Sequence, residues 1–121
     1  MGKLSTHVLD TTRGRPGNNI AIAVYRVEGS QRQLVTQAVT NHDGRCDAPL
    51  LQGDALAVGV YELVFSVGPY FATYESADSK NDTSVRFLSD VVIRFGVPSA
   101  DEHYHVPLLI SPYSYSTYRG S

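Results

Sequence analysis

The sequence predicts an all-β domain, a Greek-key β-sandwich of seven to eight strands with one short helix. Two observations lead to this prediction. Short runs rich in Val, Ile, Thr, Tyr and Phe recur along the chain, and clusters of Gly, Pro, Asn, Asp and Ser separate them, as is typical of antiparallel strands joined by turns. The chain has 121 residues, a usual length for one domain, so residues 1–121 are expected to form a single unit with two packed sheets.

Three strands are expected in the first half of the chain, at residues 4–10, 20–27 and 33–40. The loop between the first two, residues 11–19, contains two glycines and a proline, which suit irregular backbone and chain reversal. Residues 41–44 read Asn-His-Asp-Gly, a sequence with turn chemistry. This turn is expected to place Arg45 at the start of the next strand.

The second half is expected to contain strands at residues 56–67, 91–95, 104–110 and 113–120. The first of these alternates only loosely between apolar and polar residues, and a kink is expected at Gly59. Pro69 opens the only helix, about three turns long and ending near Asp78, because proline is tolerated in the first helical turn. Residues 79–83 are polar and are expected to form a loop.

Composition excludes several classes of function. The net charge is −2, and the 10 basic residues are spread along the chain, without the basic stripe that binding to a nucleic acid requires. No apolar stretch is long enough for a membrane span or a signal peptide, so a cytoplasmic location is expected. The single cysteine, Cys46, cannot form an internal disulfide or build a thiolate zinc site by itself. The chain has no Gly-x-Ser-x-Gly, P-loop or His-Glu-x-x-His motif, so any chemistry must come from residues assembled in space.

Side chains alternate across a strand, so residue parity predicts which residues share a face. In the first strand His7 shares a face with Ser5, whereas Val8 points toward the core. In the strand at 104–110, His105 and the other odd-numbered residues lie opposite a fully apolar face. Both histidines are therefore expected on sheet surfaces that face away from the core.

Pro107 cannot donate a backbone hydrogen bond to a neighbouring strand. Its strand is therefore expected at a sheet edge, or at least unpaired at that residue, and an edge invites a partner subunit. In the last strand, Tyr118 lies on a face of small residues that leaves room for a ligand, while Arg119 lies on the opposite face. A terminal carboxylate on Ser121 would be a fixed acceptor beside them.

The residues alone leave several interpretations open. A histidine on a strand is more often a satisfied surface or interface residue than a catalyst, and His42, which sits in a turn, is interpreted in that way. His7, His103 and His105 could instead bind a divalent metal ion, although no carboxylate or thiolate lies at a convincing spacing. The ending at Ser121 is also compatible with an accident of chain length.

Both ends of the chain carry the motifs of a known family. Residues 104–121, Tyr-His-Val-Pro-Leu-Leu-Ile-Ser-Pro-Tyr-Ser-Tyr-Ser-Thr-Tyr-Arg-Gly-Ser, resemble the signature that closes transthyretin-like proteins, and the final Tyr-Arg-Gly-Ser is similar to that of the family's 5-hydroxyisourate hydrolase branch. Residues 5–10 and the loop after them resemble the family's first strand and loop. His7, Arg45 and His105 match positions that the hydrolases fill with these residue types and the hormone carriers do not.

The resemblance runs from about residue 4 to the end of the chain. It implies a β-sandwich subunit that pairs edge to edge into a dimer, with two dimers forming a homotetramer whose active sites lie at the dimer–dimer interface. It also implies hydrolysis of the small molecule 5-hydroxyisourate to 2-oxo-4-hydroxy-4-carboxy-5-ureidoimidazoline in urate degradation, with no metal or organic cofactor. A carrier with the same fold and a purely structural sandwich are the alternatives.

Such a hydrolysis needs a base for water, a donor for the oxyanion and an acid for the departing nitrogen. The resemblance implies catalytic roles for His7, Arg45, His105 and Ser121. It implies substrate binding by His7, Arg45, Tyr118 and Arg119. His7 is expected to be the main base, since imidazole titrates near neutral pH, and His105 to orient or relay the proton.

The two arginines are expected to hold the carbonyl oxygens of the substrate and to stabilise the oxyanion, because guanidinium is a permanently charged planar donor. Tyr118 is expected to contact the substrate edge. Ser121 is expected to fix the histidines through its carboxylate. A rival role for Ser121 as a covalent nucleophile lacks both a downstream chain to position it and an elbow motif before it.

Overall fold

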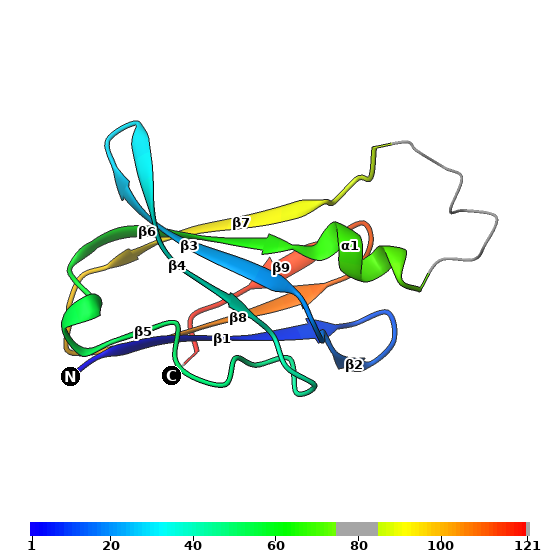
Figure 1. Ribbon diagram of the computed structural model, residues 1–121, viewed down its shortest axis with the longest axis horizontal. Helices are drawn as coiled ribbons and strands as arrows, with labels where there is room; N and C mark the ends of the chain where they lie inside the picture. The colour runs from blue at the N-terminus through cyan, green and yellow to red at the C-terminus, as the bar shows by residue number, and fades with distance from the viewer. Residues whose placement is uncertain (75–84, 121) are drawn as a thin grey trace.

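Two β-sheets enclose one apolar core in the computed structural model (Figure 1), which describes residues 1–74 and 85–120. The first sheet has the strand order β2-β1-β8-β9, and β5 also pairs with β1. The second sheet has the order β4-β3-β6-β7. The predicted all-β architecture of two packed sheets with one short helix is thereby confirmed.

The strands of the first sheet are Lys3–Asp10 (β1), Arg15–Pro16 (β2), Leu51–Gln52 (β5), His103–Ile110 (β8) and Tyr115–Thr117 (β9). Those of the second sheet are Ala21–Glu28 (β3), Gln31–Val39 (β4), Gly59–Ser66 (β6) and Asp90–Val97 (β7). A short 3-10 helix, Gly53–Ala55 (η1), and an α-helix, Val67–Ala72 (α1), connect strands. Among the described residues, no helix has the length and apolar character needed to cross a membrane.

Alternation of side chains along the strands builds the core. In β1 and β8 every even-numbered residue is buried, and these side chains meet the inner face of the second sheet, where Leu63 and Phe65 of β6 are fully buried. Each fully buried aliphatic side chain among them, such as Leu4, Val8 and Leu108, contributes roughly 1.5–3 kcal/mol through the removal of apolar surface from water. The parity prediction is confirmed, because Val8 is fully buried while His7 and His105 are partly exposed on the other face.

The parallel pairing of β1 with β8 decides what stands on the outer face of the first sheet. Ser5 lies opposite His105, and His7 lies opposite Pro107, although the paired residues are 100 positions apart in the chain. On the inner side, the Thr6 hydroxyl donates a hydrogen bond of 2.7 Å to the Val106 carbonyl. This register places the two outward-facing histidines on adjacent strands. Strands β1 and β8 lie side by side in Figure 1.

Pro107 does not lie on an edge strand, and that part of the prediction is wrong. Strand β8 runs between β1 and β9 in the interior of the first sheet. The other predicted possibility, that Pro107 itself lacks backbone pairing, is confirmed on the side of β8 that faces β9. The β8–β9 ladder covers residues 108–110 of β8, and pairing resumes only at the bridge between His105 and Gly120. The gap falls at the residue that has no N–H to donate.

The helix begins two residues before Pro69 and ends earlier than expected. Pro69 is its third residue, where the missing N–H has no intrahelical partner to lose. After Ala72 the chain tightens into turns, because the Thr73 N–H bonds the Tyr70 carbonyl and the Thr73 hydroxyl donates to the same oxygen at 2.7 Å. The predicted end near Asp78 and the predicted loop at 79–83 lie outside the described residues.

Three further boundaries differ from the predictions. Strand β6 starts at Gly59 instead of bending there, and the φ of 149° at this residue is one that side chains rarely adopt, which favours glycine. The last strand is only three residues long. The turn at 41–44 is confirmed, but Arg45 makes an isolated bridge with His7 and does not begin a strand.

Candidate active site

The candidate site lies on the outer face of the first sheet, where β1 and β8 each supply one histidine. His7 of β1 and His105 of β8 are on the same face, since their partners across the strands are Pro107 and Ser5. Both side chains are partly buried. The two imidazoles therefore stand near each other on rigid neighbouring strands, as a pair of groups that share one proton-transfer task requires.

His105 is held from two sides. The Ser5 hydroxyl lies 2.9 Å from Nδ1 of the imidazole, and the Gly120 N–H donates a hydrogen bond of 2.7 Å to the His105 carbonyl. A Cβ at position 120 would lie 2.9 Å from Cδ2 of the same ring. Only glycine therefore allows the terminal segment to come this close to the imidazole.

His7 is held by the turn that precedes Arg45. Its Nε2 lies 3.0 Å from the carbonyl oxygen of Asp43. Because a carbonyl can only accept, Nε2 is the nitrogen that carries the proton. In the neutral imidazole this leaves the lone pair on Nδ1, which is thus the nitrogen able to act as a base.

The turn at 41–44 is docked tightly against β1. Gly44 has a φ of 77°, a conformation that disfavours residues with a Cβ. Its carbonyl accepts a hydrogen bond of 2.8 Å from the Val8 N–H, and an added Cβ would clash with the Val8 carbonyl. This close contact brings both the Asp43 carbonyl and Arg45 to His7.

The guanidinium of Arg45 acts electrostatically on both histidines. Partial burial lowers the pKa of His7, and the positive charge of Arg45 lowers it further, against a smaller opposing effect of Asp43. Burial likewise lowers the pKa of His105, followed by the charges of Arg45 and His7. Both imidazoles are therefore biased toward the neutral form near pH 7, which is the form that can accept a proton.

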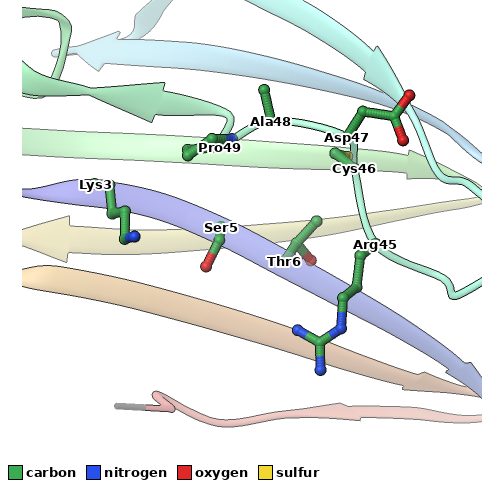
Figure 2. A pocket seen from close by; sticks show the side chains of 8 residues that line it. All are labelled: Lys3, Ser5, Thr6, Arg45, Cys46, Asp47, Ala48 and Pro49. Carbon is green, nitrogen blue, oxygen red and sulfur yellow. The ribbon is translucent and has the colours of Figure 1, made fainter.

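A cavity of about 210 Å³ adjoins this cluster. It is lined by Lys3, Ser5, Thr6, Arg45, Cys46, Asp47, Ala48 and Pro49. In Figure 2 the side chains of Lys3, Ser5 and Arg45 point to the same side of β1, toward β8 and the C-terminal segment. The cavity thus offers two cationic groups and a hydroxyl next to the histidine pair.

Cys46 lines the same cavity but is a poor nucleophile. Burial raises the pKa of its thiol, and the neighbouring Asp47 raises it further, so the thiolate is rare near neutral pH. Among the residues that the structure describes, no group of three His, Cys, Asp or Glu side chains is arranged to hold a metal ion.

The structure brings together three of the predicted site residues, His7, Arg45 and His105, and places two others elsewhere. Tyr118 is largely exposed and lines a separate cavity between the terminal segment and β7. Arg119 donates through Nη2 to Oε1 of Glu102 at 2.8 Å. This ion pair would compete with a substrate for the guanidinium. Ser121 lies outside the described residues.

Sequence reasoning missed two parts of the cluster. Ser5 is two residues before His7 and lies on the same strand face, so alternation could have indicated it as a site residue. Only the parallel register shows that it contacts His105. The contact with the Asp43 carbonyl could not be predicted from the sequence, because every residue has a backbone carbonyl. Both contacts orient an imidazole, the kind of support that catalytic histidines usually have.

Relatives of known name match nearly the whole chain. A 5-hydroxyisourate hydrolase of Pseudomonas aeruginosa is 58% identical over 121 residues, 100% of this chain and 93% of the relative. One from Ralstonia nicotianae is 54% identical and covers 100% of both chains. The catalytic candidates of this chain therefore stand in a sequence that is similar to hydrolases along its full length.

Solved structures of the same fold include a synthase, a hydrolase and a transthyretin. An (S)-allantoin synthase gives a TM-score of 0.85 at 43% identity, over 99% of this chain and 44% of that longer one. A 5-hydroxyisourate hydrolase of Klebsiella pneumoniae gives 0.76 at 33%, over 100% of both chains. Sea bream transthyretin in complex with thyroxine gives 0.80 at 25%, over 98% of this chain and 94% of that one. Residues 4–120 match the model of the HIUase/Transthyretin family, and this chain belongs to that family.

Proposed function

We propose that this chain hydrolyses 5-hydroxyisourate to 2-oxo-4-hydroxy-4-carboxy-5-ureidoimidazoline in the degradation of urate. The observation that carries the proposal is the cluster of His7, His105 and Arg45, two imidazoles biased to the neutral form beside a guanidinium. The chain surrounding it is 58% identical to a 5-hydroxyisourate hydrolase. A carrier needs only affinity for its ligand, whereas a hydrolase needs groups that move protons.

His7 is proposed as the general base. With Nε2 bonded to the Asp43 carbonyl, Nδ1 takes a proton from water as the water oxygen bonds to the cyclic amide carbon. The ring C–N bond then breaks, the departing nitrogen receives a proton, and the new carboxyl group remains on the product. General base catalysis of this kind contributes about 10²- to 10⁴-fold to the rate.

Arg45 is proposed to stabilise the oxyanion that forms on the amide oxygen. Its guanidinium lines the cavity, and a fixed positive donor there costs no reorganisation during the reaction. His105, oriented by Ser5, is proposed to relay the proton toward the departing nitrogen. No metal ion or organic cofactor enters these steps.

The remaining predicted roles concern the terminal segment. Tyr118 is proposed to contact the substrate edge, and a catalytic role is proposed for Ser121. Arg119 was predicted as a second holder of the substrate carbonyls. Because its side chain is bonded to Glu102, we assign the carbonyl contact to Arg45 alone.

The assembly is proposed to be a homotetramer with the active sites at the dimer–dimer interface. The position of the site supports this, since His7 and His105 lie on the outer surface of a sheet and not inside the sandwich. A second subunit placed on this face would exclude water from the site and strengthen its electrostatic interactions. The cytoplasmic location stays a prediction from the sequence.

The direct test follows the ultraviolet decay of 5-hydroxyisourate, freshly generated from urate, with and without the protein. The spontaneous decay gives the baseline. Decay accelerated by the protein and unaffected by a chelator would support the proposal, including its metal-free chemistry. If well-folded protein left the decay unchanged, the hydrolase proposal would fail, and thyroxine binding would be the next measurement because a family member binds it.

A further inference from the structure

Arg119 ties the terminal segment to the beginning of β8. Its Nη2 donates to Oε1 of Glu102 at 2.8 Å and to the His103 carbonyl at 3.2 Å. The guanidinium carbon lies 4.5 Å from the centre of the Tyr104 ring, within the range of a cation–π contact. One planar side chain thus makes three contacts with three consecutive residues, which a lysine could not reproduce.

These contacts lie next to a break in the backbone pairing, on the far side of the bridge that follows it. The β8–β9 ladder ends at the pair of Leu108 with Thr117, and the next pairing is the bridge of His105 with Gly120. Pro107 has no N–H to continue the ladder between them. Within the break the Thr117 hydroxyl donates to the Pro107 carbonyl at 2.7 Å. Beyond the bridge, Arg119 adds its contacts with residues 102–104 and fastens the segment one residue before Gly120.

Gly120, the residue after Arg119, contacts His105 of the site directly. Its N–H is bonded to the His105 carbonyl, and its α-carbon is so close to the ring that an added Cβ would lie 2.9 Å from Cδ2. On the opposite side the ring meets the Ser5 hydroxyl. If the terminal segment moved away, the imidazole would lose one of its two supports and part of its burial.

We propose that Glu102 and Arg119 form a clasp that positions His105 by holding Gly120 against its imidazole. Arg119 is then a positioning residue that does not touch the substrate. The inference rests on the proposed hydrolysis for its consequence on rate, but the geometry of the clasp can be tested without it. Glu102 and Arg119 are 51% and 54% exposed, so the ion pair is of the moderate, salt-sensitive kind.

The kinetic test compares Glu102→Gln, Arg119→Gln and the double variant in the 5-hydroxyisourate assay. Both single changes weaken the same clasp, and Arg119→Gln, which removes all three contacts, should lower kcat about three- to tenfold with KM nearly unchanged. Glu102→Gln should lower kcat by no more than that, and the double variant should be no slower than Arg119→Gln alone. If Arg119 held the substrate instead, Arg119→Gln alone would raise KM and Glu102→Gln would have no effect. That result would overturn the clasp.

Glu28→Gln is the matched control. This change removes an ion pair on the second sheet, in which Nε of Arg26 lies 3.5 Å from Oε1 of Glu28. Its rate should equal that of the parent protein. A loss of the same size in this control would show that any surface ion pair matters equally, and the positioning role of Glu102 would be rejected.

A second measurement is independent of activity. The pKa of His105 is followed by NMR titration of its imidazole in the parent protein and in the same variants. Burial is the largest cause that lowers this pKa, and the charges that act on the ring, Arg45 and His7, lie outside the terminal segment. Opening the clasp reduces the burial alone, so the pKa should rise in both single variants.

The two measurements separate the two proposals. An unchanged His105 pKa in folded variants, checked by thermal melting, would overturn the clasp whether or not the protein hydrolyses 5-hydroxyisourate. A raised pKa in a protein without hydrolase activity would support the clasp and reject the proposed function. A raised pKa together with the lower kcat would support both.

Discussion

The outer faces of the two sheets each carry a cluster that contains arginine. In one cluster the arginines are paired with a carboxylate, and in the other, among the described residues, the arginine is not. On the second sheet, Glu62 of β6 lies between Arg32 and Arg94, with oxygen–nitrogen distances of 3.0 and 2.8 Å. On the first sheet, Arg45 stands beside two histidines. Within the part of the chain that the structure describes, no carboxylate pairs with its guanidinium.

The pKa shifts follow from this difference. The hydrogen bond from Arg94 lowers the pKa of Glu62, and the bond and charge of Arg32 add to it, against an opposing effect of burial. The positive charge of Arg45 has no such partner in the described part of the chain, and it lowers the pKa values of His7 and His105. A cluster that satisfies its own charges serves stability, whereas one that leaves a cation unpaired keeps it available for a ligand. The following predictions test that distinction.

Replacing His7 by alanine should have the largest effect on activity. If Nδ1 of His7 is the base, kcat should fall by about two to four orders of magnitude, measured by the decay of 5-hydroxyisourate. His42→Ala is the matched control, because that histidine sits in the same turn region with its side chain 85% exposed, and it should leave kcat unchanged. If kcat fell less than about tenfold in folded His7→Ala protein, His7 would not be the general base.

Replacing Arg45 by glutamine should lower kcat by about 10²- to 10³-fold, the usual effect of losing one oxyanion donor. The same change should raise the pKa values of His7 and His105, because the charge of Arg45 lowers both. A histidine base works in its neutral form, so the acidic limb of the pH–rate profile should move to higher pH. Arg15→Gln, at an exposed position of β2, is the control, and an unshifted limb in Arg45→Gln would contradict the electrostatic coupling.

Replacing Gly120 by alanine should slow the reaction by roughly 10- to 100-fold, as expected for a displaced catalytic group. The new Cβ would lie 2.9 Å from Cδ2 of His105 and push the ring from its place. Gly96→Ala is the control on the second sheet, since a Cβ there meets nothing within 4 Å. Equal rates for both variants, with crystal structures that show an unmoved imidazole, would refute the close-contact argument.

Replacing Glu62 by glutamine should change stability and leave the activity per folded molecule intact. We expect the free energy of unfolding at pH 7 to fall by about 1–3 kcal/mol, since two arginines lose a charged partner. The lowered pKa of Glu62 means that its contribution is complete above the unfolded pKa of about 4.3 and is lost as the pH falls through the lower folded value. Denaturant titrations at several pH values should show the parent and variant converging in acid. A loss of kcat in folded protein would instead place this cluster in the function.

Much of the local structure could be predicted because it depends on local properties. The alternation along residues 4–10 and 104–110 predicted which side chains enter the core, and the structure confirms it for Val8 and Leu108. Burial of one strand face is a short-range pattern that any packed sheet must obey. Strand ends were less accurate, because the tight docking of Gly44 depends on residues distant in the chain.

The sequence by itself determined that this protein is a two-sheet sandwich, that His7 and His105 face outward, and that its two ends resemble those of a hydrolase family. The tertiary structure decided which of the candidates meet. The parallel register of β1 with β8 joins Ser5 to His105, the docked turn brings Arg45 to His7, and an ion pair joins Arg119 to Glu102. Parity along one strand says which way a side chain points, but strand register and loop docking are set by contacts between residues up to 100 positions apart, which no local pattern encodes.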